Sequence, residues 1–208
     1  MKNNQDSLKY WSKTNKWFLN SYKNSWVEEL IHGPVKLREQ CAVSSAKLIN
    51  SKTILDLGCG PCRVLSRALN ETNAENAIGL DFSKSMLEES RKHLESLNLS
   101  AKVLLKEADL IKMRNYPKAD IAFALGLFDY IEEPKIILKK AHQSSNYLVA
   151  SWPAPNFRNF LRKFRYSCPI YTYSKTDIID LFNQIDINSI DFISAGGFSG
   201  YITISKKS

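Results

Sequence analysis

One stretch of this 208-residue chain decides its fold, and it reads Ile54-Leu55-Asp56-Leu57-Gly58-Cys59-Gly60-Pro61-Cys62-Arg63. An apolar segment of strand character ends in an acid and two glycines, and a helical segment begins directly afterwards. Glycines in such a turn let the backbone approach a ligand closely, and the start of a helix offers unpaired amide donors. The stretch therefore predicts a strand–turn–helix unit whose turn binds a ligand.

Short apolar segments then alternate with helical ones. We expect strands at Thr53–Leu57, Ala77–Leu80, Lys102–Lys106, Ala119–Leu125 and Tyr147–Ser151, and helices at Cys62–Asn70, Ser83–Leu97 and Pro134–Ser144. Repeated strand–helix–strand order predicts a parallel sheet with crossover helices. Further on we expect a helix at Ser174–Asn183 and two strands, Asn188–Ser194 and Phe198–Ser205, joined by the turn Ala195-Gly196-Gly197. That turn predicts a late antiparallel hairpin.

The first 50 residues are predicted to be helical. Their large apolar side chains recur at spacings of one, three or four residues, and they are Trp17, Phe18, Tyr22, Trp26, Leu30 and Ile31. Gly33-Pro34 is expected to end this helix, and Val35–Ile49 is expected to form a second one. We interpret the segment as a helical cap beside the sheet.

Composition excludes several classes of protein. Hydrophobic residues make up 44% of the chain and charged residues 24%, which are ordinary globular values. The longest apolar run, Ile121–Phe128, is far shorter than the roughly 20 residues of a membrane span. The amino terminus has no export signal, and Cys41, Cys59, Cys62 and Cys168 do not resemble a disulfide framework. These features predict a cytoplasmic protein, and its net charge of +8 favours anionic partners.

Three further motifs follow the strands in order. Ala77–Ser83 places Asp81 at the end of the second strand, where a carboxylate can accept both hydroxyls of a ribose. Asp81 lies 25 positions after Asp56, near the roughly 20-residue spacing of nucleotide-binding folds. Phe82 can pack on an adenine face, and Ser83 is expected to cap the next helix with Met86 on its inner side.

The other two motifs are Lys106–Leu110 and Asp120–Ile131. With the first two, they resemble the ordered motif set of the class I S-adenosylmethionine-dependent methyltransferases, over residues 53–151. The resemblance implies a Rossmann-like α/β fold with a seven-stranded, mostly parallel sheet, a late antiparallel hairpin, helices on both faces and an N-terminal helical cap. It also implies S-adenosyl-L-methionine as the cofactor.

The resemblance assigns roles to individual residues. The turn formed by Asp56, Gly58, Cys59 and Gly60 would hold the methionine part of the cofactor. Asp109 would accept a hydrogen bond from the adenine amino group, and Leu110 offers a backbone amide. Ligands in open α/β sheets bind outside the carboxyl ends of the strands, so Leu125 and Gly126 would border the methionine part. Asp129 and Tyr130 are candidates for facing the methyl acceptor, and Phe128 and Ile131 are expected to pack inward.

The domain organisation follows from these assignments. We expect a single methyltransferase domain, 1–208, with the cap at 1–50, the cofactor-binding core at 51–151, an insert on the substrate side at 152–173 and a C-terminal helix and hairpin at 174–208. The insert contains a basic-aromatic helix, Phe157–Tyr166. Arg158, Arg162 and Arg165 share one face of it, and together with Tyr22 they are candidates for binding the substrate. An amphipathic surface helix without a binding role is the alternative.

Other functions fit less well. A nicotinamide-dependent dehydrogenase would need a third glycine where Arg63 stands. Cys59-Gly60-Pro61-Cys62 matches the thioredoxin motif, and a helix start lowers a cysteine pKa, but no tryptophan precedes Cys59. Zinc is disfavoured because only one C-x2-C pair exists, so no metal is expected.

The acceptor is less well defined than the cofactor. RNA or a protein is an alternative acceptor, but the sequence lacks an N-P-P-Y-type motif after the fourth strand. We expect a small, partly apolar, anionic metabolite, methylated at oxygen or nitrogen, and a monomer or homodimer without a membrane span. His32, His93 and His142 are weak candidates for a general base, and His93 is expected to be solvated. Alignment of an already nucleophilic atom can suffice without any base.

Overall fold

The computed structural model describes residues 6, 10, 25–156, 159–160, 168–194 and 200–207, and of 25–34 only the backbone. Within this part of the chain, seven strands form one sheet in the order β3-β2-β1-β4-β5-β7-β6. The strands are β1 (Thr53–Leu57), β2 (Asn76–Asp81), β3 (Val103–Glu107), β4 (Ala119–Ala124), β5 (Ser145–Pro153), β6 (Ser189–Ser194) and β7 (Gly200–Lys206). The first five pair in parallel. β7 is antiparallel to both β5 and β6.

The predicted sheet is therefore confirmed, including the late antiparallel pair, although the turn at 195–197 lies outside the described residues. The helices are α3 (Ser25–Leu48), α4 (Arg63–Glu71), α5 (Lys84–Ser96), α6 (Pro134–Ser144) and α8 (Lys175–Asn183). Two short 3₁₀ helices, η1 (Ser100–Lys102) and η2 (Phe128–Tyr130), also lie in the part of the chain that the structure describes. None of the described helices is long and apolar enough to span a membrane.

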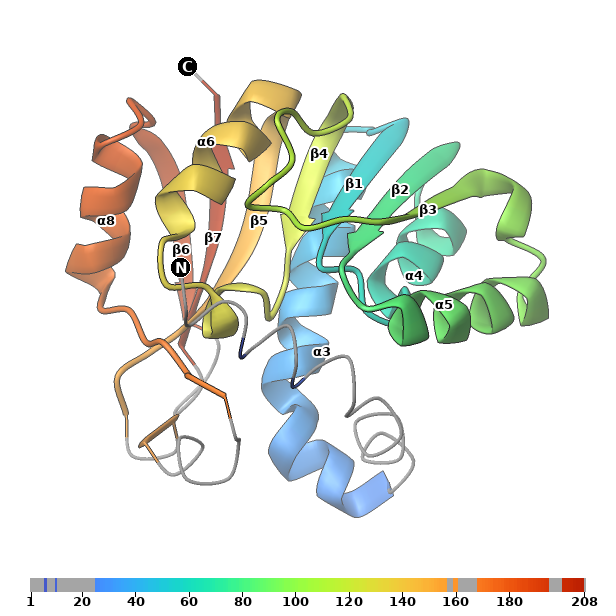
Figure 1. Cartoon of the computed structure of the whole chain (residues 1–208), viewed down its shortest axis with the longest axis horizontal. Helices are drawn as coiled ribbons and strands as arrows, with labels where there is room; N and C mark the ends of the chain where they lie inside the picture. The colour runs from blue at the N-terminus through green and yellow to red at the C-terminus, as the bar shows by residue number, and fades with distance from the viewer. Residues whose placement is uncertain are drawn as a thin grey trace.

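The helices cover both faces of the sheet (Figure 1). On one face, α3, α4 and α5 enclose a core that includes Ile54, Ile121 and Val149. On the other face, α6 and α8 enclose a second core that includes Leu55, Ala122 and Leu148. Successive strand residues thus alternate between two buried faces, as the period of a strand requires. Continuous apolar runs are expected of strands that are buried on both faces.

The N-terminal prediction was wrong in one respect. α3 is continuous from Ser25 to Leu48 and passes through Gly33-Pro34. A proline in a helix interior removes one backbone hydrogen bond and also clashes with the Cβ of the residue before it. Gly33 has no Cβ, which lifts the second penalty. Further along the helix Ala42, Val43 and Ala46 are buried in the core, and this packing offsets the lost hydrogen bond.

Trp152, at the end of β5, ties the second face together. Its ring stacks on Phe128 with centroids 4.2 Å apart, and it meets Tyr173 and Phe182 edge-on. Its indole Nε1 donates to the Thr203 hydroxyl over 2.9 Å. The bond crosses from β5 to β7, so the antiparallel strand is fixed by a polar contact as well as by apolar packing.

We expect Thr203→Val to lower the free energy of unfolding by about 1–3 kcal/mol, because the substitution keeps the side-chain shape but leaves a buried indole donor unpaired. Chemical denaturation measures the change. Thr176→Val, at an exposed position in α8, is the matched control and should change stability by less than about 0.5 kcal/mol. Equal effects of the two substitutions would show that the Trp152–Thr203 bond contributes nothing.

Candidate functional site

The turn between β1 and α4 is held in place by the neighbouring strand. The amides of Gly58 and Cys59 both donate to the carbonyl of Leu80, over 2.8 and 3.1 Å. Gly58 has a φ of +75°, and a Cβ at this position would lie 3.2 Å from Leu127 Cδ1. The positive φ therefore favours glycine after β1, and any Cβ there would also crowd Leu127.

Asp81, at the end of β2, holds two loops at once. One carboxylate oxygen accepts from the Gly60 amide over 2.9 Å, and the other accepts from the Ser83 amide over 2.8 Å. Each carboxylate oxygen has a second lone-pair direction, so these bonds leave Asp81 able to accept from a ligand. Burial raises the pKa of Asp81, and backbone hydrogen bonds from Ser83, Gly60 and Phe82 oppose that shift.

The residues after Asp81 lie as the sequence predicts. The Ser83 hydroxyl caps α5 by accepting from the Met86 amide over 3.3 Å. Met86 is buried on the inner side of α5, and Phe82, which lies between Asp81 and Ser83, is half-buried. The predicted helix cap is confirmed, and the same residues border the carboxyl end of β2.

Asp56 is a buried acid with an unsatisfied oxygen. Its residue is only 2% exposed, and its Oδ2 has no hydrogen-bond partner among the described residues. Burial, followed by the negative charges of Asp81 and Glu39, raises the pKa of Asp56 to about 8, and Arg38 opposes this shift. Buried polar atoms are nearly always paired. The free oxygen therefore indicates a ligand that donates a hydrogen bond or carries positive charge.

Arg38, on α3, belongs to this site and was missed by the sequence analysis. A Cβ placed on Gly126 would lie 3.0 Å from Arg38 Nη1 and 3.1 Å from Nη2, so the guanidinium rests directly against that glycine. Gly126 has a φ of +71°, and its amide donates to the Ser151 hydroxyl over 2.7 Å. Arg38 Nε is buried without a partner in the described part of the chain. An anionic ligand beside Gly126 would satisfy it.

The loop after β3 is fixed by its own acid and by a lysine from α6. Asp109 Oδ1 accepts from the Ile111 amide over 3.0 Å, and the half-buried Asp109 also forms an ion pair with Lys112. Lys140 Nζ donates to three loop carbonyls, those of Leu110, Ile111 and Met113. The loop that presents Asp109 and Leu110 is therefore built as a rigid unit.

The loop after β4 carries the remaining predicted residues. Leu125 and Gly126 are half-buried, and η2 follows them. Phe128 is fully buried, which confirms its inward packing. Asp129 is also buried, and its carbonyl accepts from the Tyr171 amide over 2.9 Å. Tyr130 is half-buried beside it, so the structure leaves the predicted roles of Asp129 and Tyr130 as proposals.

The cysteine pair has the wrong environment for a redox site. Cys59 and Cys62 are both buried, and a hydrogen bond with Cys62, followed by burial, raises the pKa of Cys59. A thioredoxin-like thiol needs a lowered pKa and partial exposure. Chemistry at the thiols is therefore disfavoured.

The histidines also differ from expectation. His93 is half-buried and shares a hydrogen bond of 3.0 Å with the Ser66 hydroxyl, so the prediction that it is solvated was wrong. His142 is buried against Ser205, 3.0 Å away, and burial lowers the pKa of His142 to about 4. Both rings serve packing between elements. Four predicted substrate residues, Tyr22, Arg158, Arg162 and Arg165, lie outside the described residues, as does the His32 side chain.

Comparison with known proteins agrees with this geometry. An uncharacterized protein of Haemophilus influenzae is 30% identical over 128 residues, which cover 57% of this chain and 50% of the relative. This chain therefore spans about half of that relative.

Two solved structures share the fold. The magnesium protoporphyrin IX methyltransferase of Synechocystis PCC 6803, solved with SAH, superposes with a TM-score of 0.76 at 18% identity, over 99% of this chain and 100% of that one. The methyltransferase domain of bacterial CtHen1-C superposes with a TM-score of 0.66 at 18% identity, over 81% and 96%. A family model described as "Methyltransferase domain" matches residues 49–166, more than half of the chain. The chain belongs to this family of methyltransferase domains.

Proposed function

We propose that this methyltransferase uses S-adenosyl-L-methionine to methylate a small, anionic and partly apolar metabolite at oxygen or nitrogen. When bound, the cofactor supplies an electrophilic methyl group on a sulfonium. The observation that carries the proposal is the pair of unsatisfied buried groups, Asp56 Oδ2 and Arg38 Nε. They suit the ammonium and the carboxylate of a methionine moiety, respectively.

The acidic residues around the turn fit the same ligand. Asp56, Asp81 and Glu39 are close enough for the two other acids to raise the pKa of Asp56, after the larger effect of burial. A ligand that carries both an ammonium and a sulfonium relieves this repulsion, whereas the pyrophosphate of a dinucleotide would increase it. The site therefore favours S-adenosylmethionine over NAD.

The other cofactor contacts are proposed from where the residues lie at the carboxyl ends of the strands. Asp81 would accept from the ribose hydroxyls, with Phe82 on the adenine face and Met86 beneath. Asp109 and Leu110 would hold the adenine edge on the rigid loop described above. The backbone of Gly58, Cys59 and Gly60 would line the methionine part, with Leu125 and Gly126 opposite. No residue is then required as a general base, because alignment of acceptor and methyl group supplies much of the rate.

Support for a small acceptor comes from the Synechocystis relative, which is named for magnesium protoporphyrin IX and matches this chain over nearly its full length. The net charge of +8 suits an anion. Arg158, Arg162, Arg165 and Tyr22 stay sequence-based candidates for holding it, with Asp129 and Tyr130 near the reacting atoms.

The direct test is calorimetry followed by a screen. S-adenosylhomocysteine should bind with roughly micromolar affinity, about −8 kcal/mol, and NAD should give no heat. A metabolite library screened with methyl-labelled cofactor should then label acidic small molecules. Transfer to bulk RNA, with binding that collapses as salt rises, would replace the small-molecule proposal. Tight NAD binding without a response to S-adenosylhomocysteine would end the cofactor proposal.

Arg38→Met should weaken S-adenosylhomocysteine binding roughly 10- to 100-fold, because a charge-assisted hydrogen bond contributes about 1.5–3 kcal/mol. 5′-Methylthioadenosine, which lacks the amino-acid carboxylate, is the matched ligand and should bind both proteins equally. Calorimetry with the two ligands separates the outcomes. If both lose affinity to the same extent, Arg38 supports the fold of the site and does not bind the carboxylate.

Asp56→Asn should stabilise the cofactor-free protein at neutral pH. The pKa of Asp56 is about 8 in the folded protein against an ordinary 3.8, so between these values the folded state keeps a proton that the unfolded chain releases. Stability therefore falls as pH rises through this window, and the asparagine variant lacks that fall. Tm measured from pH 5 to pH 8 should show the variant's advantage widening with pH.

The same variant should bind S-adenosylhomocysteine more weakly, because a neutral amide replaces the carboxylate proposed to pair with the ammonium. Parallel Tm curves for variant and wild type across this pH range would show that Asp56 is already ionised. The proposal that Asp56 lowers the stability of the cofactor-free protein as pH rises would then be wrong.

A further inference from the structure

A serine of α5 contacts the turn between β1 and α4. Ser90 is fully buried, and its hydroxyl donates to the carbonyl of Gly60 over 2.5 Å. The same hydroxyl lies 2.9 Å from the carbonyl of Met86, one helical turn earlier. A serine hydroxyl has a single hydrogen, and two oxygens as close as Ser90 Oγ and the Gly60 oxygen need a hydrogen between them. The hydrogen therefore points to Gly60.

The Gly60 carbonyl is the group through which this part of the turn can be held. The next residue is Pro61, which has no N–H, so the peptide that joins the two residues has an acceptor and no donor. On the other side of the same α-carbon, the Gly60 amide donates to Asp81 over 2.9 Å. Gly60 is therefore fixed from both sides, by a carboxylate of β2 and by a hydroxyl of α5.

The space beside Gly60 is open. Its φ of +49° favours glycine, and a Cβ built on it would meet no atom within 4 Å among the residues that the structure describes. At Gly58 and Gly126, by contrast, a Cβ would crowd a neighbouring side chain. The backbone that Ser90 holds is thus accessible to a ligand.

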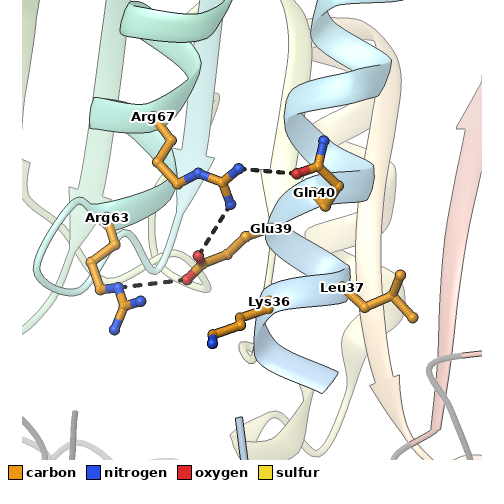
Figure 2. Close-up of a pocket in the computed structure, with 6 residues that line it drawn as sticks. All are labelled: Lys36, Leu37, Glu39, Gln40, Arg63 and Arg67. Atoms are coloured by element: carbon orange, nitrogen blue, oxygen red, sulfur yellow. Dashed lines mark hydrogen bonds and ion pairs between the residues drawn. The ribbon is translucent and has the colours of Figure 1, made fainter. Parts of the chain in front are cut away.

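The helix that follows the turn is fixed by separate contacts. Figure 2 shows Glu39 of α3 between Arg63 and Arg67 of α4, at distances of 3.7 and 3.6 Å. Arg67 also donates to Gln40 over 3.0 Å. These contacts hold α4 against α3 and do not involve Ser90. Loss of the Ser90 hydroxyl should therefore release the Gly60 peptide and leave the helix in place.

We infer that Ser90 is a positioning residue for the cofactor. By holding the Gly60 carbonyl, Ser90 keeps the Gly60 amide against Asp81, and this amide orients the Asp81 carboxylate toward the ribose hydroxyls. The inference rests on the proposed function, because the contact between Asp81 and the ribose is part of it. It adds a residue that acts on the cofactor through two successive hydrogen bonds.

The test compares S-adenosylhomocysteine with its 2′,3′-dideoxy analogue, which lacks the ribose hydroxyls. Calorimetry on the full chain should show that Ser90→Ala weakens S-adenosylhomocysteine binding roughly 3- to 10-fold, the effect of one neutral hydrogen bond. The dideoxy analogue should bind Ser90→Ala and the unmodified protein equally, because the orientation of Asp81 matters only to a ligand that donates to it.

Ser144→Ala is the matched control. Ser144, on α6, is also a buried helical serine, and its hydroxyl lies 2.9 Å from the carbonyl of Lys140, four residues earlier, and 3.1 Å from that of Tyr116. It directly precedes β5, so it lies at the end of the parallel strands opposite to the turn after β1. Ser144→Ala should leave the affinities for both ligands unchanged.

Three results would overturn the inference. Equal losses of affinity for both ligands in Ser90→Ala mean that Ser90 supports the fold of the turn and does not orient Asp81. An unchanged affinity for S-adenosylhomocysteine means that the turn keeps its position without the hydroxyl. The same selective loss in Ser144→Ala means that the effect is common to buried helical serines and does not depend on contact with Gly60.

The unmodified protein separates this inference from the proposed function. If it binds S-adenosylhomocysteine and the dideoxy analogue equally, Asp81 does not hold the ribose, so the proposed contact fails and Ser90 has nothing to orient. If it prefers S-adenosylhomocysteine and Ser90→Ala keeps the same preference, the contact of Asp81 with the ribose stands and only the role of Ser90 fails.

Discussion

The whole site depends on the position of β1, which is hydrogen-bonded to β2 on one side and β4 on the other. Along the chain, β2 and β3 are added on one side of β1, and β4 is then added on the other side of β1. The loops that leave β1 and β4 therefore diverge, and the opening between them lies at the carboxyl ends of the strands. Asp56, Asp81 and Gly126 reach this opening from three different strands. The bonds from Gly58 and Cys59 to Leu80 keep the first loop from closing it.

This opening concentrates acidic groups that the fold alone does not need. Asp56 sits without a partner on one oxygen, and its ionisation is resisted by burial and by neighbouring acids. Residues that cost stability in the free protein are typical of binding sites, where the ligand supplies the missing partner. Arg38 Nε is likewise buried without a partner among the described residues.

The strands were predictable because short apolar runs alternate with helical segments along the chain, and where the structure describes them the predicted and observed ends differ by no more than two residues. The cofactor turn and the Ser83 cap were predictable because glycine positions and capping chemistry are local. The break at Gly33-Pro34 was predicted wrongly, because packing of Ala42, Val43 and Ala46 on the sheet outweighs a local helix-breaking signal.

Arg38 could not be found from motifs, since it comes from a helix that precedes all of them in sequence. One signal was present. Arg38 lies four residues before Ala42 and eight before Ala46, so a charged residue continues an otherwise buried helical stripe. The acceptor side was least predictable, because substrate pockets depend on side chains from separate elements and no local pattern encodes them.

The region that matches the family is shorter than the region that folds as one unit, and α3 lies outside the match. The family match begins at residue 49, one residue after α3 ends, yet α3 contributes Ala42, Val43 and Ala46 to the core on one face of the sheet. The match also stops at residue 166, before β7, which supplies the Thr203 partner of Trp152. A fragment cut at the homology boundaries would expose apolar strand surface on one face and an unpaired edge of β5. A fragment that keeps both faces of the sheet covered must therefore include α3 and β7 as well as the matched residues.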